Sequence, residues 1–188
     1  MHYTSLMLTK TESILLWSSN LWGLGMGMLG PLYAVFALEI GGNVLDITWV
    51  YAVYLMFMGV GVIVVGKIAD TVGHEKLLVA GYGLSAVATF GYLLVNSIVG
   101  LLIVQILIAI AIALSEPNWF ALYDRHSGDG KNDGFVWGLS SGLWYIFNGI
   151  AILIGGYIVT IHSFDALFIV MGIVLTLSTL QQARILKK

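Results

Sequence analysis

The sequence predicts an all-α membrane protein with six transmembrane helices. Of its 188 residues, 59% are hydrophobic and only 10% are charged, whereas a soluble domain is roughly 45–50% apolar and about 25% charged. Six largely uncharged runs each approach or exceed the ~20 residues that cross a bilayer as a helix. Glycine, 23 of the 188 residues, is common where transmembrane helices pack closely. With a net charge of −2 and no basic patch, the composition also excludes disorder, a coiled coil and nucleic-acid binding.

The first run, residues 14–38, contains no charged side chain. The apolar core of a signal peptide is roughly 7–15 residues long and ends at a cleavage site of small residues. This run is longer and leads directly into Glu39-Ile40-Gly41-Gly42. We therefore expect it to be the first transmembrane helix.

The other five runs are separated by segments with turn residues. Gly41-Gly42-Asn43 precedes the second run, Asn96-Ser97 the fourth and His162-Ser163 the sixth. The one long hydrophilic segment, residues 124–133, separates the fourth run from the fifth and includes Ser127-Gly128-Asp129-Gly130. We expect a single domain over residues 1–188, with helices at about residues 14–38, 47–65, 77–95, 98–123, 135–161 and 164–180.

All Lys and Arg residues fall on one side of this six-helix topology. They are Lys10, Lys67, Lys76, Arg125, Lys131, Arg184, Lys187 and Lys188. The other side carries Glu39, Asp46 and Asp165 and no basic residue. Because basic residues collect in cytoplasmic loops, we expect a multi-pass protein of the cell (plasma or inner) membrane with both termini in the cytoplasm.

The segment after the second expected helix carries the most specific motif. It reads Gly66-Lys67-Ile68-Ala69-Asp70-Thr71-Val72-Gly73-His74-Glu75-Lys76. This resembles the signature between helices 2 and 3 of major facilitator superfamily transporters, G-x-L-A-D-R-x-G-R-K. The matching residues are Gly66, Ala69, Asp70 and Gly73, Lys76 supplies a cation near the end, and the departures from the usual basic positions are Thr71, His74 and Glu75. The resemblance covers all six expected helices.

The resemblance implies a gating role for this segment, whose contacts hold the cytoplasmic side of one transporter conformation closed. Gly66 lets two helices approach closely. Asp70 can accept hydrogen bonds from a helix N-terminus and can pair with a cation such as Arg125. We therefore expect Asp70 and Arg125 to act in gating. The alternative is that Asp70 only ends the second helix in a polar loop.

The two prolines mark an internal similarity. Pro31 lies in the first expected helix and Pro117 in the fourth, and an aromatic residue stands two positions after each. Phe-Ala-Leu and then an acid follow in both places. Because these two helices cross in opposite directions, the pattern is typical of a three-plus-three inverted repeat within one six-helix half of a major facilitator fold.

A full member of this superfamily has two six-helix halves, with the substrate site between them. Two copies of this chain (2 × 188 = 376 residues) would be about as long as a complete transporter. We therefore expect a parallel homodimer of half-transporters in the lipid bilayer, which moves a small-molecule substrate by alternating access. The alternatives are a half that pairs with a different half, and a non-transporting membrane interaction subunit.

Glycines are expected at the centre of that homodimer. In the family, helices 2 and 5 of one half face the other half. The second expected helix carries Gly59, Gly61 and Gly66 toward its cytoplasmic half. The fifth carries a stripe at helical spacing, Gly138, Gly142, Gly149 and Gly156. The alternative is that these glycines pack helices within one chain.

Polar side chains inside lipid are costly and usually face a cavity or a partner. Asn20 and Gln105 lie about 10 Å deep in the first and fourth helices, which line the cavity in the family. Asn148 lies near the middle of the fifth helix and shares a face with Trp144. We expect these four residues to line the substrate cavity. The alternative is a helix–helix hydrogen bond for the polar residues and a lipid-facing position for Trp144.

The charged residues inside the helices bear on the substrate. None of the expected helices contains Lys or Arg, so a neutral, cationic or amphipathic solute is favoured over an anion. Glu116, directly before Pro117, is the one acid in an otherwise apolar run and could carry protons or simply be solvated near the cytoplasmic end. No Ser/His, paired-Asp or metal-ligand constellation occurs, so we predict neither an enzyme nor a metal or cofactor site.

Overall fold

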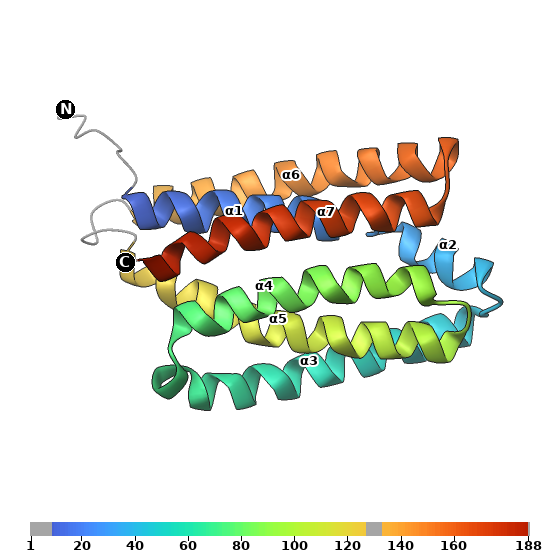
Figure 1. The fold of residues 1–188 in the computed structure, drawn as a ribbon, viewed down its shortest axis with the longest axis horizontal. Helices are drawn as coiled ribbons and strands as arrows, with labels where there is room; N and C mark the ends of the chain where they lie inside the picture. The colour runs from blue at the N-terminus through green and yellow to red at the C-terminus, as the bar shows by residue number, and fades with distance from the viewer. Residues whose placement is uncertain (1–8, 127–132, 188) are drawn as a thin grey trace.

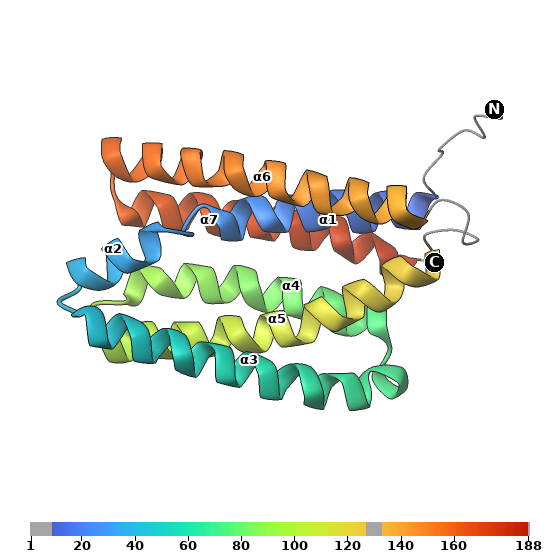
Figure 2. The same cartoon turned by 180° about the vertical axis from the view of Figure 1, so that it is seen from behind.

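The computed structural model describes residues 9–126 and 133–187. The turn expected at Ser127–Gly130 and the basic residues Lys131 and Lys188 lie outside them. The helices are α1 (Lys10–Gly27), α2 (Leu32–Glu39), α3 (Val44–Val72), α4 (His74–Gly91), α5 (Ile98–His126), α6 (Asp133–Ile161) and α7 (Phe164–Gln182), with short 3₁₀ turns η1 (Tyr92–Leu94) and η2 (Ala183–Lys187). Figures 1 and 2 show them as one elongated bundle, without a strand in the described residues.

Five of these helices, α3 to α7, are long and apolar enough to cross a membrane. The pair α1 and α2 meets the same criterion when taken together, with a bend of 41° at the break between them. In Figure 1, α2 continues from the end of α1 to the end of the bundle where α3 begins. Counting this pair as one broken span gives six spans.

The break corrects the expectation of one continuous helix over residues 14–38. The helix α1 ends at Gly27 and α2 begins at Leu32, with a turn between them. Pro31 explains the break, because its nitrogen has no hydrogen to donate to the carbonyl one turn earlier and its ring collides with that carbonyl. The backbone N–H of Tyr33 donates to the carbonyl of Leu29 at 3.0 Å. This bond supplies a partner for a backbone group that would be costly to leave unpaired in lipid.

Both ends of α3 follow from its sequence. Asn43 Oδ1 accepts from the backbone N–H groups of Leu45 and Asp46, at 2.8 and 3.1 Å, and Asp46 accepts from the N–H of Asn43 at 3.0 Å. This reciprocal cap begins the helix. The helix continues past Val65, where the apolar run ends, and stops at Gly73, whose φ of +103° favours glycine. Asp70 therefore lies in the last turn of α3.

The packing of the helices has the symmetry of the expected repeat. The closest pairs are α4 with α5, α3 with α5, α1 with α7, α4 with α7, and α1 with α6. If the first three spans are exchanged with the last three, α3–α5 becomes α6–α1, α4–α5 becomes α7–α1, and α4–α7 maps onto itself. The packing therefore confirms the expected three-plus-three organisation of the six spans.

The helices α3 and α6 lie at opposite edges of the bundle (Figures 1 and 2). Within the most apolar stretch of each, 11% of the residues are buried, against 50% in α4 and in α5. Large apolar side chains on these two helices, among them Met56, Val60 and Leu153, are more than 60% exposed. The chain alone thus leaves α3 and α6 to be covered by lipid or by another protein.

The two ends of the bundle differ in charge. The start of α1, the turn η2 and the α3–α4 junction lie at one end (Figure 1). This end, which we call the basic end, carries the described cations Lys10, Lys67, Lys76, Arg125, Arg184 and Lys187. The opposite end, called the acidic end, carries Glu39, Asp46 and Asp165. No Lys or Arg among residues 9–126 and 133–187 lies at the acidic end.

Candidate functional site

A cleft of about 470 Å³ lies among five helices. It is lined from α1 by Ser19 and Trp22, from α3 by Tyr54 and Met58, from α4 by Tyr82, from α5 by Ile112, Ser115, Glu116, Trp119 and Phe120, and from α6 by Trp137, Ser140, Ser141, Trp144 and Tyr145. On α5 and α6 these residues recur at intervals of three and four, so each helix presents one face to the cleft.

Aromatic side chains make up more than half of this lining, and two of the indoles are held by hydrogen bonds. The N–H of Trp22 donates to Ser85 Oγ at 3.2 Å, and the N–H of Trp119 donates to the carbonyl of Leu15, also at 3.2 Å. Trp22 in addition stacks on Tyr82, with ring centroids 5.9 Å apart. These contacts fix the orientation of ring surfaces that could bind an apolar or cationic molecule.

Glu116 is the one charged side chain in the lining. It is exposed, and among the described residues no hydrogen bond or ion pair engages its carboxylate. It is placed by α5, where Pro117 follows it inside the helix. The cleft therefore combines aromatic walls with one available carboxylate.

Of the two cavity residues expected on α6, Trp144 and Asn148, only the first lines the cleft, as Glu116 does. Asn148, one turn further on, donates to the Trp144 carbonyl at 2.9 Å and packs against α1: a Cβ placed on Gly27 would lie 2.6 Å from Asn148 Oδ1. Asn148 therefore lies in the α1–α6 contact within the chain and is not part of the cleft lining.

Asn20 and Gln105 lie in the interior of the chain, away from the cleft lining. Asn20 is 1% exposed and donates to the Leu16 carbonyl at 2.7 Å, while its Oδ1 has no hydrogen-bond partner in the described part of the chain. Gln105 is 6% exposed and donates to the Tyr92 hydroxyl at 3.3 Å. Gln105 thus bonds to a neighbouring helical segment, η1, whereas the hydrogen bond of Asn20 stays within α1. A cavity role for these two residues stays a prediction.

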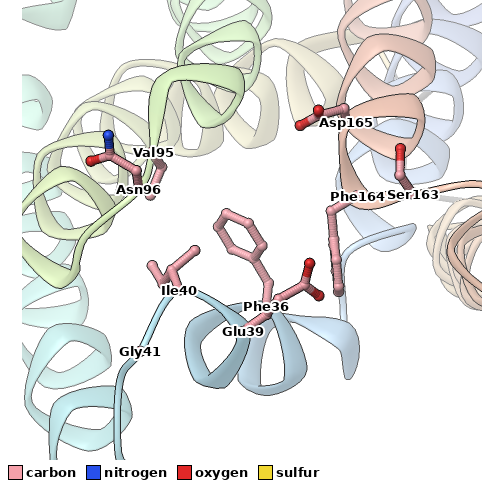
Figure 3. A pocket seen from close by; sticks show the side chains of 9 residues that line it. All are labelled: Phe36, Glu39, Ile40, Gly41, Val95, Asn96, Ser163, Phe164 and Asp165. Carbon is pink, nitrogen blue, oxygen red and sulfur yellow. The ribbon is translucent and has the colours of Figure 1, made fainter.

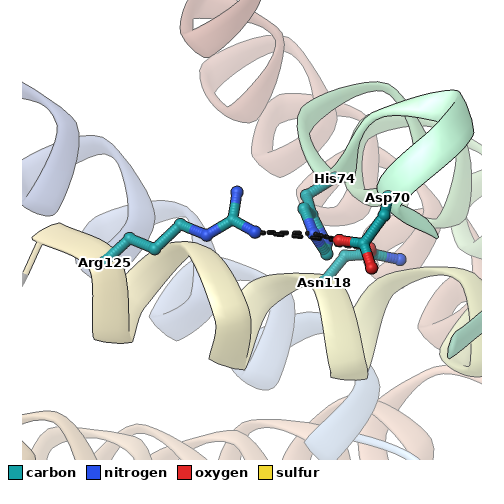
Figure 4. A network of polar contacts seen from close by, with 4 residues as sticks. All are labelled: Asp70, His74, Asn118 and Arg125. Atoms are coloured by element: carbon teal, nitrogen blue, oxygen red, sulfur yellow. Dashed lines mark hydrogen bonds and ion pairs between the residues drawn. The ribbon is translucent and has the colours of Figure 1, made fainter.

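The two residues expected to act in gating, Asp70 and Arg125, meet at the basic end (Figure 4). Asp70 and Arg125 lie 3.9 Å apart, from Oδ1 to Nη2, and their side chains are 84% and 56% exposed. His74, the first residue of α4, lies between them, with Nε2 at 3.2 Å from Asp70 Oδ1 and 3.1 Å from Arg125 Nη2. Its Nδ1 is 2.7 Å from Oδ1 of the buried Asn118. Exposed ion pairs contribute only about 0–1 kcal/mol to stability. The contacts of this cluster therefore orient its side chains and add little to the stability of the fold.

Six of the seven glycines expected at an interface face open space within the chain, and Gly61 is the exception. A Cβ added at Gly59, Gly66, Gly138, Gly142, Gly149 or Gly156 would have no other atom within 4 Å. Their neighbours in sequence behave differently: a Cβ on Gly61 would lie 2.7 Å from Ala113, and one on Gly155 would collide with the backbone of Met28. The contacts between helices inside the chain therefore do not explain the six open glycines.

A second hollow, of about 560 Å³, lies at the acidic end (Figure 3). It is bordered by the end of α2, the α4–α5 connection and the start of α7. Phe36 and Phe164 are its buried aromatic residues, with ring centroids 5.1 Å apart, and Glu39 and Asp165 are its acids. None of the residues expected from the sequence to act in substrate binding or gating lines this hollow.

Sequence reasoning did not find several residues of the cleft and of the basic-end cluster. Tyr54, Tyr82, Trp119 and Trp137 come from four different helices, and no local pattern shows that these helices meet. The intervals of three and four residues between Trp137 and Tyr145 could have shown a polar and aromatic face on α6. His74 was expected in a loop, and its contact with Asn118, 44 residues away, has no signal in the sequence.

Comparisons with known proteins agree with this architecture. The sequence profile described as Major Facilitator Superfamily matches residues 15–186. An uncharacterized MFS-type transporter of Methanocaldococcus jannaschii is 31% identical over 94 residues, and the uncharacterized MFS-type transporter YvkA of Bacillus subtilis is 36% identical over 84 residues. These matches cover 50% and 45% of the chain.

The tetracenomycin C resistance and export protein of Streptomyces glaucescens is 24% identical over 132 residues, which is 70% of the chain. The three matches cover 24%, 19% and 24% of the relatives' own lengths. The profile match over almost the whole chain, the six apolar spans and the three-plus-three packing identify the chain as a member of the major facilitator superfamily.

Proposed function

We propose that this chain is a half-transporter, which moves a small solute across a membrane by alternating access as a parallel homodimer. The observation that carries the proposal is the coincidence of two features on the same helices. The cleft is lined in part by α3 and α6, and the open glycines lie beside it on those helices. Gly59 follows the cleft residue Met58, and Gly142 follows the cleft residue Ser141.

A second copy would cover the surfaces that the single chain leaves open. Glycines in a transmembrane helix let a partner helix approach closely and gain van der Waals contact. In a two-fold arrangement about the membrane normal, α3 and α6 of one chain would pack against the same two helices of the other. The two clefts would then face each other near the middle of the membrane, where transporters of this kind bind their substrates.

The lining of the cleft indicates the class of substrate. Aromatic faces attract cations as well as apolar groups, and the carboxylate of Glu116 would favour a positive charge. The lining contains no Lys or Arg to neutralise an anion. We infer a cationic or neutral amphipathic solute. Because one relative is named as a resistance and export protein, export is the direction to test first.

If transport is coupled to protons, Glu116 is the first carboxyl to test. In liposomes with a pH gradient, Glu116→Gln is expected to lose most of the gradient-driven uptake, because a neutral amide can neither bind nor release the proton. Uptake of a fluorescent organic cation is the measurement. Glu39→Gln, which removes a carboxylate at the acidic end, is the matched control and should transport normally. Wild-type rates for Glu116→Gln would eliminate Glu116 as the carrier.

For orientation, we propose that the basic end faces the cytoplasm of a cell that carries the protein in its plasma or inner membrane. The uneven distribution of Lys and Arg supports this direction. Reporter domains fused after Gly42, Ser97 and Ser163, which follow the first, third and fifth spans, are expected to report an external position. A cytoplasmic signal from any one of these fusions would overturn the assignment.

We further propose that Asp70 holds the basic end closed in the outward-open state. Its highly exposed carboxylate is free to accept hydrogen bonds from the N-terminus of α6 in the partner chain. Asp70→Asn is expected to shift the population toward inward-open without unfolding the protein. Distances between spin labels on the two basic ends measure this shift, and Glu75→Gln is the control for loss of a neighbouring carboxylate. Unchanged distance distributions would remove the gating role.

The two alternatives predict different outcomes in reconstituted vesicles. A half that needs a different half would be inactive alone and would become active when its partner is added. A non-transporting interaction subunit would form a complex without solute movement in either case. The purified chain alone should transport if the homodimer is correct.

A further inference from the structure

We propose that His74 is a proton-binding site at the basic end, where one added proton exchanges Arg125 for Asp70 as the hydrogen-bond partner of the ring. The motif of the family has a basic residue at this position, whereas this chain has a side chain whose charge changes between about pH 5 and 8 when it is unperturbed. Figure 4 shows His74 between the two charged side chains, with Asn118 behind it.

One side of the ring is fixed by Asn118. The Asn118 amide nitrogen donates to the Leu114 carbonyl at 2.8 Å, so the oxygen of the same amide is the atom turned to His74. That oxygen lies 2.7 Å from Nδ1 and can only accept. Nδ1 therefore carries a hydrogen in both charge states, and the neutral ring is left with an unprotonated Nε2.

The other ring nitrogen has two partners that exclude each other. Nε2 is 3.1 Å from Arg125 Nη2 and 3.2 Å from Asp70 Oδ1. A guanidinium group only donates and a carboxylate only accepts. The neutral ring thus accepts a hydrogen bond from Arg125, whereas the protonated ring donates one to Asp70 and repels Arg125. The proton decides which contact forms.

The C-terminal ends of α3 and α5 and the first turn of α4, which hold this cluster, carry charged residues. In the described part of the chain they are Lys67 and Asp70 on α3, Glu75 and Lys76 on α4, and Asp124 and Arg125 on α5. The ring itself is largely covered, with a side-chain exposure of 12%. Asp70 is already within 3.9 Å of Arg125, so Arg125 can move from the ring to the carboxylate when the proton arrives.

The consequence for gating rests on the proposed function. Protonated His74 and Arg125 both bind Asp70 within its own chain, and this binding competes with the helix N-terminus of the partner chain. Acidification at the basic end should therefore release the closed gate and favour the inward-open state. Loss of the proton should return Asp70 to the partner chain.

The proton site can be tested directly by ¹⁵N NMR of histidine-labelled protein in lipid nanodiscs. The chain has four histidines, and comparison with His74→Gln assigns the signal of interest. At high pH we expect a hydrogen on Nδ1 and none on Nε2. Asp70→Asn removes the acceptor of the protonated ring and should lower the pH at which the second proton binds, whereas Arg125→Gln removes the donor to the neutral ring and should raise it.

Two NMR results would overturn the proposal. One is a neutral ring that carries its hydrogen on Nε2. The other is that Asp70→Asn and Arg125→Gln fail to shift the titration of His74 in opposite directions. This experiment reads the site within each chain, so failure of the homodimer proposal would leave its result interpretable.

The effect on gating has a separate readout. Distances between spin labels at the two basic ends should shift toward inward-open when the wild type is acidified through the titration of His74. In His74→Gln the distances should no longer respond over that range. If the NMR titration behaves as expected but the distances of the wild type do not respond, the proton site stands and its link to the gate is wrong.

Discussion

In the Gly142→Leu variant, the chain is expected to lose both its dimer and its uptake activity while it keeps the six-helix fold. A Cβ at Gly142 has no other atom within 4 Å, so the new side chain can begin there without a clash inside the chain. Replacing glycine in a helix even removes a penalty of about 1 kcal/mol. In the dimer, the same side chain would stand where two backbones approach closely. Mass measurement in nanodiscs and uptake into liposomes give the two readouts.

Two variants control for this result. Gly142→Ala adds one methyl group at the same position and should keep most of the dimer. Val87→Leu enlarges a side chain on α4 that is 69% exposed but lies outside the proposed interface, and it should transport normally. If Gly142→Leu remains a transporting dimer, α6 does not lie at the interface as proposed.

The second large effect is expected from Gly155→Ala, which should destabilise the fold. An added Cβ would overlap the carbonyl oxygen of Met28 and lie 2.8 Å from its carbonyl carbon and 3.0 Å from its Cα. These are backbone atoms of the break between α1 and α2, so no side-chain rotation can make room. Overpacking of this kind costs about 1–3 kcal/mol, and the midpoint of denaturant-induced unfolding should fall accordingly.

Gly156→Ala is the matched control, because it makes the same change one residue further along α6. A Cβ there has no other atom within 4 Å, so its stability should be unchanged or slightly raised by the better helix propensity of alanine. Equal unfolding midpoints for the two variants would mean that α6 does not pack against the break in the way described.

The fold was predictable because its strongest signals are local in sequence. Long uncharged runs, the motif from Gly66 to Lys76 and the one-sided distribution of Lys and Arg are all read directly from the chain. The break after Gly27 was missed because a proline in a membrane helix can be accommodated as a kink. At this break the backbone of Met28 lies against Gly155, more than 120 residues away in the chain, and no local pattern in the sequence shows that contact.

The candidate site was predictable only in part, since depth in the membrane can be read from the sequence and the facing direction of a helix cannot. Trp144 and Glu116 line the cleft, whereas Asn20 and Gln105 are buried away from its lining. On α1 this depends on which face of the helix packs inward, whereas Gln105 and Glu116 share a face of α5 and are separated along it, since eleven residues make about three helical turns. The meeting of His74 with Asn118 and Arg125 likewise depends on the packing of α3, α4 and α5.

The central claim is that the transporting unit consists of two copies of this chain. The most direct test is native mass measurement of the purified protein released from the same lipid preparation that shows uptake. We expect a species of two 20.4 kDa chains and no other protein, with uptake lost in step with the dimer in Gly142→Leu. A preparation that transports while its chains are all monomeric would contradict the account.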